Sequence, residues 1–165
     1  MERKKVWYAP YKFESYGEEE IKAVEESLRS GWLGGQGPRS IEFEKTIAKR
    51  FGKKYGVFVN SGSSACLLSI AALDLPKESK IITPACTFST TLAPIIQLGF
   101  KPVFVDVEPT TYCVDVEQIE SQINERTVAI LAPNLMGNLC NWPRIKEIAK
   151  QYNLRIIEDS ADTLG

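Results

Sequence analysis

The fold is indicated most clearly by residues 80–107, which read KIITPACTFSTTLAPIIQLGFKPVFVDV. An apolar, β-branched run at Lys80–Thr83 is followed by a helix-like segment at Phe88–Leu98 and by a second apolar run at Pro102–Val107. Each run is apolar at successive positions, which is typical of strands covered on both faces. Gly99 directly follows the helix-like segment, where glycine commonly ends a helix. The stretch therefore predicts a strand, a crossover helix and a parallel strand.

The same alternation of strand and helix continues on both sides of this stretch and predicts an α/β fold with a largely parallel sheet and flanking helices. Glycine, proline and polar residues separate the segments. The expected strands are Tyr55–Val59, Lys80–Thr83, Pro102–Val107, Val128–Ala132 and Leu154–Glu158. The expected helices between them are Ser63–Leu73, Phe88–Leu98, Asp115–Ile123 and Trp142–Tyr152, with a capping box formed by Asp115 and Gln118.

Residues 1–55 lack this alternation and predict a separate N-terminal helical segment, ahead of a partial α/β domain at 56–165. Two helices are expected, Gly17–Arg29 and Pro38–Phe51, each with an apolar stripe on one side. A glycine-rich loop at 31–37 lies between them. The loop does not match the dinucleotide motif G-x-G-x-x-G, because Ser40 stands where the third glycine would be. A nicotinamide-dependent dehydrogenase is therefore a poor interpretation.

The composition excludes several classes of chemistry. The chain has 165 residues, 20 Lys plus Arg, 21 Asp plus Glu, and no histidine. The absence of histidine excludes a Ser-His triad and a histidine metal site from these residues, and the balanced charge speaks against nucleic acid as a partner. No run approaches the ~18 apolar residues of a membrane span. Four scattered cysteines without a C-x-x-C pair, and the lack of an apolar leader, predict a reduced, cytoplasmic protein.

A first candidate site is the segment Asn60-Ser61-Gly62-Ser63-Ser64-Ala65, which follows an expected strand and opens an expected helix. Free backbone amides at a helix N-terminus and two hydroxyl groups suit a phosphate. Gly62, Ser63 and Ser64 are the residues expected to bind it. An ordinary serine-capped helix is an equally good interpretation of this motif alone.

Two further candidates lie at other expected strand ends. Glu158, Asp159 and Asp162 follow the last strand, where carboxylates are costly to bury unless a metal or a cationic ring pairs with them. Phe88 follows the second strand and could stack on a planar ligand. Taken singly, a solvated strand end and a core aromatic are the simpler interpretations. Together with the phosphate motif, they describe a site for a flat, phosphorylated, protonated heterocycle, such as pyridoxal 5′-phosphate (PLP).

The chain resembles the nucleotide-sugar aminotransferase family of the DegT/StrS type, PLP-dependent enzymes of fold type I. The resemblance runs from about Trp32 to Gly165. It is carried by Gly31-Trp32-Leu33, Phe43-Glu44, the Asn60–Ala65 motif, Pro84-Ala85-Cys86-Thr87-Phe88, Pro102–Val107 and the run Ile157–Gly165. It implies that Gly62, Ser63 and Ser64 hold the cofactor phosphate, that Phe88 stacks on the pyridine ring, and that Asp159 pairs with the ring nitrogen.

The residue Asp162 departs from the His or Gln usual in aminotransferases of the family. Asp162, which we assign to the cofactor site, and the run Asn134-Leu135-Met136-Gly137-Asn138 look more like the branch that removes the 3-hydroxyl of a CDP-linked 4-keto-6-deoxy sugar. That branch uses pyridoxamine 5′-phosphate (PMP), replaces the Schiff-base lysine with histidine and receives electrons from a reductase. Transamination and C-3 dehydration both remain open.

No lysine of the chain stands at a position that matches the family's Schiff-base lysine, which follows the Glu158-Asp159 motif by about two strands. We therefore expect a cofactor-binding segment of a larger enzyme, without the C-terminal part of the large domain or the small domain. The resemblance also implies a nucleotide-sugar substrate and a homodimer. The alternative from a different class is a non-catalytic binding or assembly module.

Overall fold

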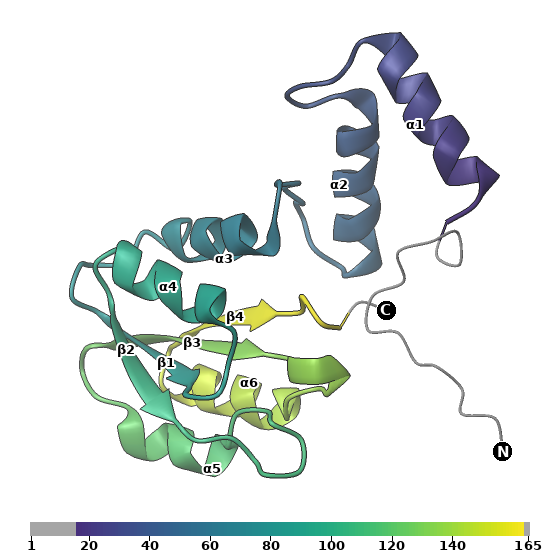
Figure 1. Ribbon diagram of the computed structural model, residues 1–165. Helices are drawn as coiled ribbons and strands as arrows, with labels where there is room; N and C mark the ends of the chain where they lie inside the picture. The colour runs from purple at the N-terminus through teal and green to yellow at the C-terminus, as the bar shows by residue number, and fades with distance from the viewer. Residues whose placement is uncertain (1–15, 164–165) are drawn as a thin grey trace, which may run out of the picture. The chain divides into compact units, whose positions relative to one another are not determined.

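The computed structural model describes residues 16–163. The chain divides into two compact units, the first reaching Phe58 and the second beginning at Val59. Figure 1 shows the course of the chain through them. Within residues 16–163, no helix is both long and apolar enough to cross a membrane.

The first unit contains α1 (Glu18–Ser30) and α2 (Pro38–Arg50), close to their expected bounds. A side-chain carboxylate caps α1, because Glu20 Oε2 accepts a hydrogen bond of 2.7 Å from the backbone N–H of Gly17. This bond lowers the pKa of Glu20. Gly31 ends α1 with φ 76°, a left-handed conformation that glycine adopts readily.

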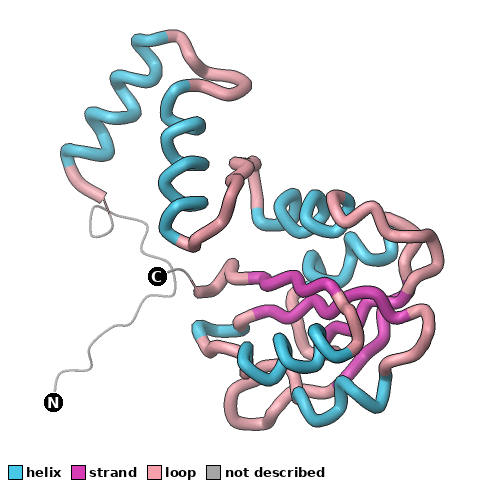
Figure 2. Tube along the Cα trace, turned by 180° about the vertical axis from the view of Figure 1, so that it is seen from behind, coloured by secondary structure: helices cyan, strands magenta, loops and turns pink. Residues whose placement is uncertain are grey.

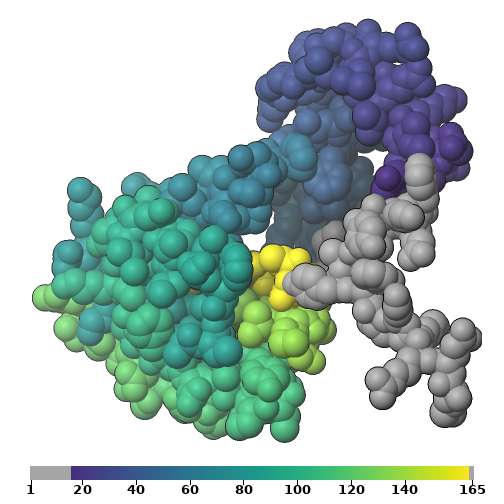
Figure 3. Space-filling view, viewed as in Figure 1, coloured from purple at the N-terminus to yellow at the C-terminus, as the bar shows by residue number. Residues whose placement is uncertain are grey.

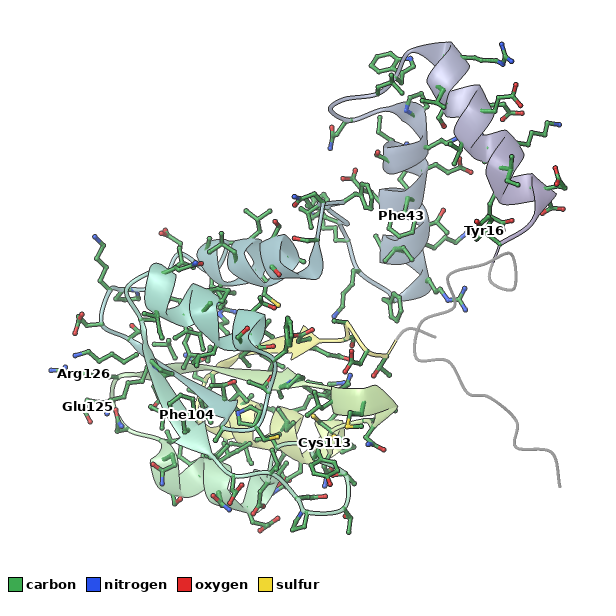
Figure 4. The ribbon with its side chains drawn as sticks, in the orientation of Figure 1. Tyr16, Phe43, Phe104, Cys113, Glu125 and Arg126 are labelled. Carbon is green, nitrogen blue, oxygen red and sulfur yellow. The ribbon has the colours of Figure 1, made fainter. Side chains whose placement is uncertain are left out.

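The segment 55–58 packs against α2 and is not a strand, so the expected strand at Tyr55–Val59 is wrong. The N–H of Phe58 donates to Glu44 Oε1 at 2.8 Å, and the rings of Phe43 and Phe58 meet edge to face with centroids 5.3 Å apart. Figure 4 shows Phe43 on α2. Tyr55 and Val57 are mostly exposed, and Phe58 contacts α2 through its ring. A run of apolar residues alone does not distinguish such a segment from a buried strand.

The second unit is built on a four-stranded parallel sheet whose order is β2-β1-β3-β4. Its strands match the four other expected runs. They are β1 (Lys80–Pro84), β2 (Lys101–Val105), β3 (Thr127–Pro133) and β4 (Arg155–Asp159). In Figure 2 the strands lie between two groups of helices.

Helices cover both faces of this sheet. On one face α3 (Gly62–Ala71) and α4 (Ser89–Gln97) enclose an apolar core that contains Ile70, Ile81, Ile95 and Leu131. On the other face α5 (Val116–Ile119) and α6 (Trp142–Gln151) enclose a second core. In the space-filling view, the teal atoms of α3 and α4 lie above the green atoms of α5 (Figure 3). The alternation of inward and outward side chains along buried strands produces these two cores.

The expected helix at Asp115–Ile123 is shorter than predicted. It consists of the four-residue α5 and the 3-10 turn η1 (Glu120–Gln122). Asp115 caps α5 by accepting from the N–H of Glu117 at 3.1 Å. Gln118 donates to the Asp115 side chain at 2.8 Å, whereas a capping box would require it to reach the backbone N–H of that residue.

The strand order reverses between β1 and β3, because β1 leads through α4 to β2 on one side and β3 lies on the other. In open parallel sheets, ligands bind beyond the carboxyl ends of the strands at such a reversal. The topology therefore predicts a ligand site at the loops that follow β1 and β3 and at the end of neighbouring β4.

Candidate active site

Asp159, the last residue of β4, is the centre of a small hydrogen-bonded cluster. Its Oδ2 accepts from Thr91 Oγ1 at 2.8 Å and from Cys66 Sγ at 3.5 Å. Its Oδ1 accepts from the backbone N–H of Ala161 at 3.1 Å. The carboxylate is thus held between α3, α4 and the turn that follows β4.

The thiol of Cys66 is protonated in this environment. Burial and, secondly, the negative charge of Asp159 raise the pKa of Cys66 to about 12. A protonated thiol can donate to a carboxylate, whereas a thiolate would repel it. Cys66 therefore acts as a donor to Asp159 and not as a nucleophile.

The N-terminus of α3 lies near Asp159, because Cys66 belongs to the beginning of this helix. Ser61 is the N-cap, and its Oγ accepts from the N–H of Ser64 at 3.2 Å. Ser64 Oγ donates to Asn60 Oδ1 at 2.7 Å. The N–H groups of Gly62 and Ser63 have no acceptor within the helix, as α-helical geometry requires of its first residues. Ser63 lies three residues before Cys66 and so on the same side of α3.

Phe88 precedes α4 at the carboxyl end of β1. The residue is 68% exposed, so the simple interpretation as a core aromatic is wrong. The carbonyl of Phe88 accepts from the N–H of Thr91 at 3.0 Å, and this is the threonine that contacts Asp159. Beside Phe88, the buried hydroxyl of Thr87 has no hydrogen-bond partner within the described chain.

Asn134, directly after β3, is a buried residue that the sequence motif included without predicting its contacts. Its Oδ1 accepts from the N–H of Cys140 and from Trp142 Nε1, both at 3.0 Å. Its Nδ2 donates to Glu158 Oε1 at 2.8 Å and to Ser160 Oγ at 3.1 Å. One amide thus joins the loop after β3 to the end of β4.

Asp162 contacts this same loop. Its Oδ2 accepts from the N–H of Met136 at 3.0 Å, and Met136 has a left-handed backbone with φ 54°. The structure thus connects Asp162 to the turn η2 (Leu135–Gly137), while Thr91 and Cys66 contact Asp159.

The sequence-predicted residues therefore gather around the reversal of strand order. Contacts through Cys66 and Thr91 place the second turn of α3 and the start of α4 next to Asp159. The described chain offers this site no cluster of three or more side chains suited to a metal ion. The arrangement can bind an anion at the α3 N-terminus and a cation at Asp159.

Residues 14–165 match the model of the DegT/DnrJ/EryC1/StrS aminotransferase family. The chain belongs to this family. Its fold agrees, because the most similar solved structures include the GDP-4-keto-6-deoxy-D-mannose-3-dehydratase of E. coli with bound hydrated PLP. That structure has a TM-score of 0.85, is 36% identical and is covered over 40% of its length by 92% of this chain.

Further similar proteins agree with this assignment. Protein MJ1066 of Methanocaldococcus jannaschii is 39% identical, with 90% of this chain matching 38% of the relative. GDP-4-keto-6-deoxy-D-mannose 3-dehydratase of Yersinia pseudotuberculosis is 36% identical, with 94% of this chain matching 41% of the relative. NtdA of Bacillus subtilis, solved with bound PMP, is 27% identical with a TM-score of 0.84, and all of this chain covers 39% of it. The chain spans about 40% of the length of these relatives.

Proposed function

We propose that the complete protein is a PLP- or PMP-dependent enzyme that acts on a nucleotide-linked keto-deoxysugar, and that this chain contains most of its cofactor-binding residues. The observation that carries the proposal is the carboxylate of Asp159, held at the end of β4 by Thr91 of α4 and by Cys66, which lies one turn after the N-terminus of α3. Family membership and the cofactors named for the solved relatives support it.

The residues present fit such a cofactor. We assign its phosphate to the N–H groups of Gly62 and Ser63 and to the hydroxyls of Ser63 and Ser64, of which the Ser64 hydroxyl would exchange its hydrogen bond to Asn60 Oδ1 for one to the phosphate. The space that a Cβ atom at Gly62 would occupy is open, with no heavy atom within 4 Å. We assign the ring to the exposed face of Phe88 and its nitrogen to Asp159, with Asp162 bordering the site through the loop after β3.

When bound, the cofactor supplies an electron-accepting ring that stabilises negative charge at the substrate carbon. The residues of this chain bind the cofactor and orient it. Asp159 favours a proton on the ring nitrogen because an adjacent carboxylate stabilises the cationic form. The α3 N-terminus favours a dianionic phosphate by its partial positive charge.

The test is whether the complete gene product binds the cofactor. Binding is detected by the near-ultraviolet and visible absorption of the cofactor. We expect PMP to bind the wild-type protein, and PLP with glutamate to change the absorption spectrum. Asp159→Asn should weaken PMP binding at least about tenfold, since hydrogen bonds to charged groups contribute ~1.5–3 kcal/mol. Asp74→Asn, an exposed residue with φ 46°, is the matched control and should bind normally. A wild-type protein that binds neither compound would refute the proposal.

A second candidate function is C-3 dehydration of the keto-deoxysugar. The residue Asp162 favours it, as do the named 3-dehydratases among the relatives. The residue that takes the Schiff-base position decides between the two reactions: lysine favours transamination and histidine favours dehydration with a reductase partner. Product analysis with a 4-keto-6-deoxy sugar nucleotide, with and without added glutamate, checks the assignment.

The proposal extends to the organisation of the enzyme. We infer a helical N-terminal segment at 1–55 and a partial cofactor-binding domain at 56–165. We also infer a homodimer and a cytoplasmic location, and the four free cysteines agree with this location. A segment comprising residues 1–165 alone should lack turnover because it holds no Schiff-base residue. Measured turnover by that segment would contradict this inference.

A further inference from the structure

We propose that Thr91 and Cys66 are positioning residues for Asp159. Their hydrogen bonds occupy Oδ2 of its carboxylate and leave one acceptor position on Oδ1 for the protonated ring nitrogen of the ligand. This inference rests on the proposed function. It assigns a role to two side chains that neither the motifs nor the relatives' names identify.

The argument begins with the acceptor capacity of the carboxylate. Each of its oxygens can accept about two hydrogen bonds. Thr91 Oγ1 and Cys66 Sγ use both positions on Oδ2, at 2.8 and 3.5 Å. The N–H of Ala161 uses one position on Oδ1 at 3.1 Å. One position on Oδ1 is left for a ligand.

The two donors come from a rigid setting. Thr91 is 1% exposed and Cys66 is 8% exposed, and they belong to the two helices that pack on one face of the sheet. Threonine in a helix divides between two χ1 rotamers, and the buried hydrogen bond to Asp159 favours the one observed. Asp159 is thus held from two directions by side chains that have little freedom of their own.

Both side-chain donors are neutral, and this determines the charge of the site. Within residues 16–163, Asp159 forms no ion pair with a lysine or arginine. An arginine at this position would neutralise the carboxylate and compete with a cationic ring. Thr91 and Cys66 fix the geometry of Asp159 and preserve its negative charge, which suits it to a protonated heterocycle.

The experiment measures PMP binding to the complete gene product by titration calorimetry, and the chemical shift of the ring nitrogen in ¹⁵N-labelled PMP. PMP is a suitable probe because it binds without a covalent bond to the protein. Thr91→Val should weaken PMP binding by about tenfold to a hundredfold, since hydrogen bonds to charged groups have stabilising effects of this size. It should also move the chemical shift of the ring nitrogen toward that of the unprotonated form. Thr91→Ser keeps the hydroxyl and should restore both values.

Two further variants control for folding and for the helix. Thr90→Val makes the same chemical change on the neighbouring residue of α4 and should leave both readouts unchanged. Cys66→Ala should weaken binding less than Thr91→Val, because a thiol is the weaker donor, and Cys66→Ser should bind at least as tightly as wild type. If Thr91→Val does not fold by circular dichroism, the comparison of the Cys66 variants decides.

The outcomes separate this inference from the proposed function. If the wild-type protein does not bind PMP, the proposed function fails. If the wild type binds PMP but folded Thr91→Val and Cys66→Ala match its affinity and its ring-nitrogen shift, the proposed function stands and the positioning role is refuted. Loss of binding in Thr91→Val that Thr91→Ser does not restore also refutes it.

Discussion

At the scale of single residues, two buried threonines in the second unit differ in one respect. Thr91 donates its hydroxyl to Asp159, whereas Thr83 in β1 is fully buried and its hydroxyl has no partner in the described chain. A buried hydroxyl without a partner costs about 1–3 kcal/mol, which an apolar group of the same shape avoids.

Thr83→Val is therefore expected to leave the stability of the protein unchanged or to raise it by up to about 1 kcal/mol. Valine keeps the shape of threonine and is favoured in strands. Urea unfolding followed by circular dichroism measures the change, with Thr91→Val as the contrasting, destabilised variant. A loss of more than about 1 kcal/mol in Thr83→Val would show that the hydroxyl has a partner in the folded protein.

The thiol of Cys66 makes stability depend on alkaline pH. Its pKa is raised from 9.0 to about 12 in the folded protein, chiefly by burial, so the folded state retains a proton that the unfolded state loses. The stabilisation is complete below pH 9 and is lost as the pH rises toward 12. Compared with Cys66→Ala, the wild-type free energy of unfolding should fall more steeply above pH 9, by up to about 1.4 kcal/mol per pH unit. Exposed Cys86 offers the control, and Cys86→Ala should follow the wild-type slope.

Sequence patterns predicted Asp159 and Phe88 as candidate site residues, and they did not indicate the side chains that contact Asp159. Asp159 and Phe88 could be named because each directly follows or closely succeeds an apolar run, which marks the carboxyl end of a strand. Thr91 and Cys66 could not, because their contacts with Asp159 span 68 and 93 residues of sequence and leave no local pattern. Cys66 and Thr91 each belong to a helix whose sequence indicates only apolar packing.

At the scale of elements, the loop between β3 and α6 depends on Asn134. This amide satisfies two donors of the loop and donates to two acceptors at the end of β4. Asn134→Ala should destabilise the protein by about 2–4 kcal/mol, because it leaves buried polar groups unpaired. Thermal unfolding measures this loss. The exposed amide of Gln97 offers a control, and Gln97→Ala should stay within about 0.5 kcal/mol of wild type.

The packing of segment 55–58 on α2 depends on Gly56. A Cβ atom at this position would lie 2.5 Å from the carbonyl oxygen of Glu44, which is backbone and cannot rotate away. Gly56→Ala should therefore cost about 1–3 kcal/mol in unfolding free energy. At Gly34 an added Cβ meets nothing within 4 Å, so Gly34→Ala should be neutral or slightly stabilising. Equal effects of the two substitutions on the unfolding midpoint would contradict this account.

The same segment shows where sequence patterns stop being informative about elements. Residues 55–59 have the composition of a strand, but strand formation needs a hydrogen-bonding neighbour. The N–H of Phe58 pairs with the Glu44 side chain instead. Each of the four runs that are strands pairs with at least one other, which is a property of the whole sheet and not of any one run.

At the scale of the whole molecule, the amphipathic pattern of α1 is real, but none of the other described residues of its own unit buries its apolar side. Ile21, Val24 and Leu28 form the predicted stripe, yet they are 39%, 60% and 58% exposed, and α1 contains no buried residue. Trp32 and Leu33 in the glycine-rich loop are exposed as well. Several exposed apolar side chains in one unit are typical of an interface.

Residues 1–165 expressed alone should therefore self-associate. The exposed stripe of α1 and the unpaired outer edges of β2 and β4 both favour contact with other chains. We expect strong binding of a hydrophobic dye, elution ahead of the monomer position and a broad, irreversible melt, whereas the complete gene product should bind little dye. Val24→Lys with Leu28→Glu should reduce dye binding by the segment, because both side chains are exposed and need no repacking. A monomeric segment with a sharp, reversible melt would show that this surface needs no partner.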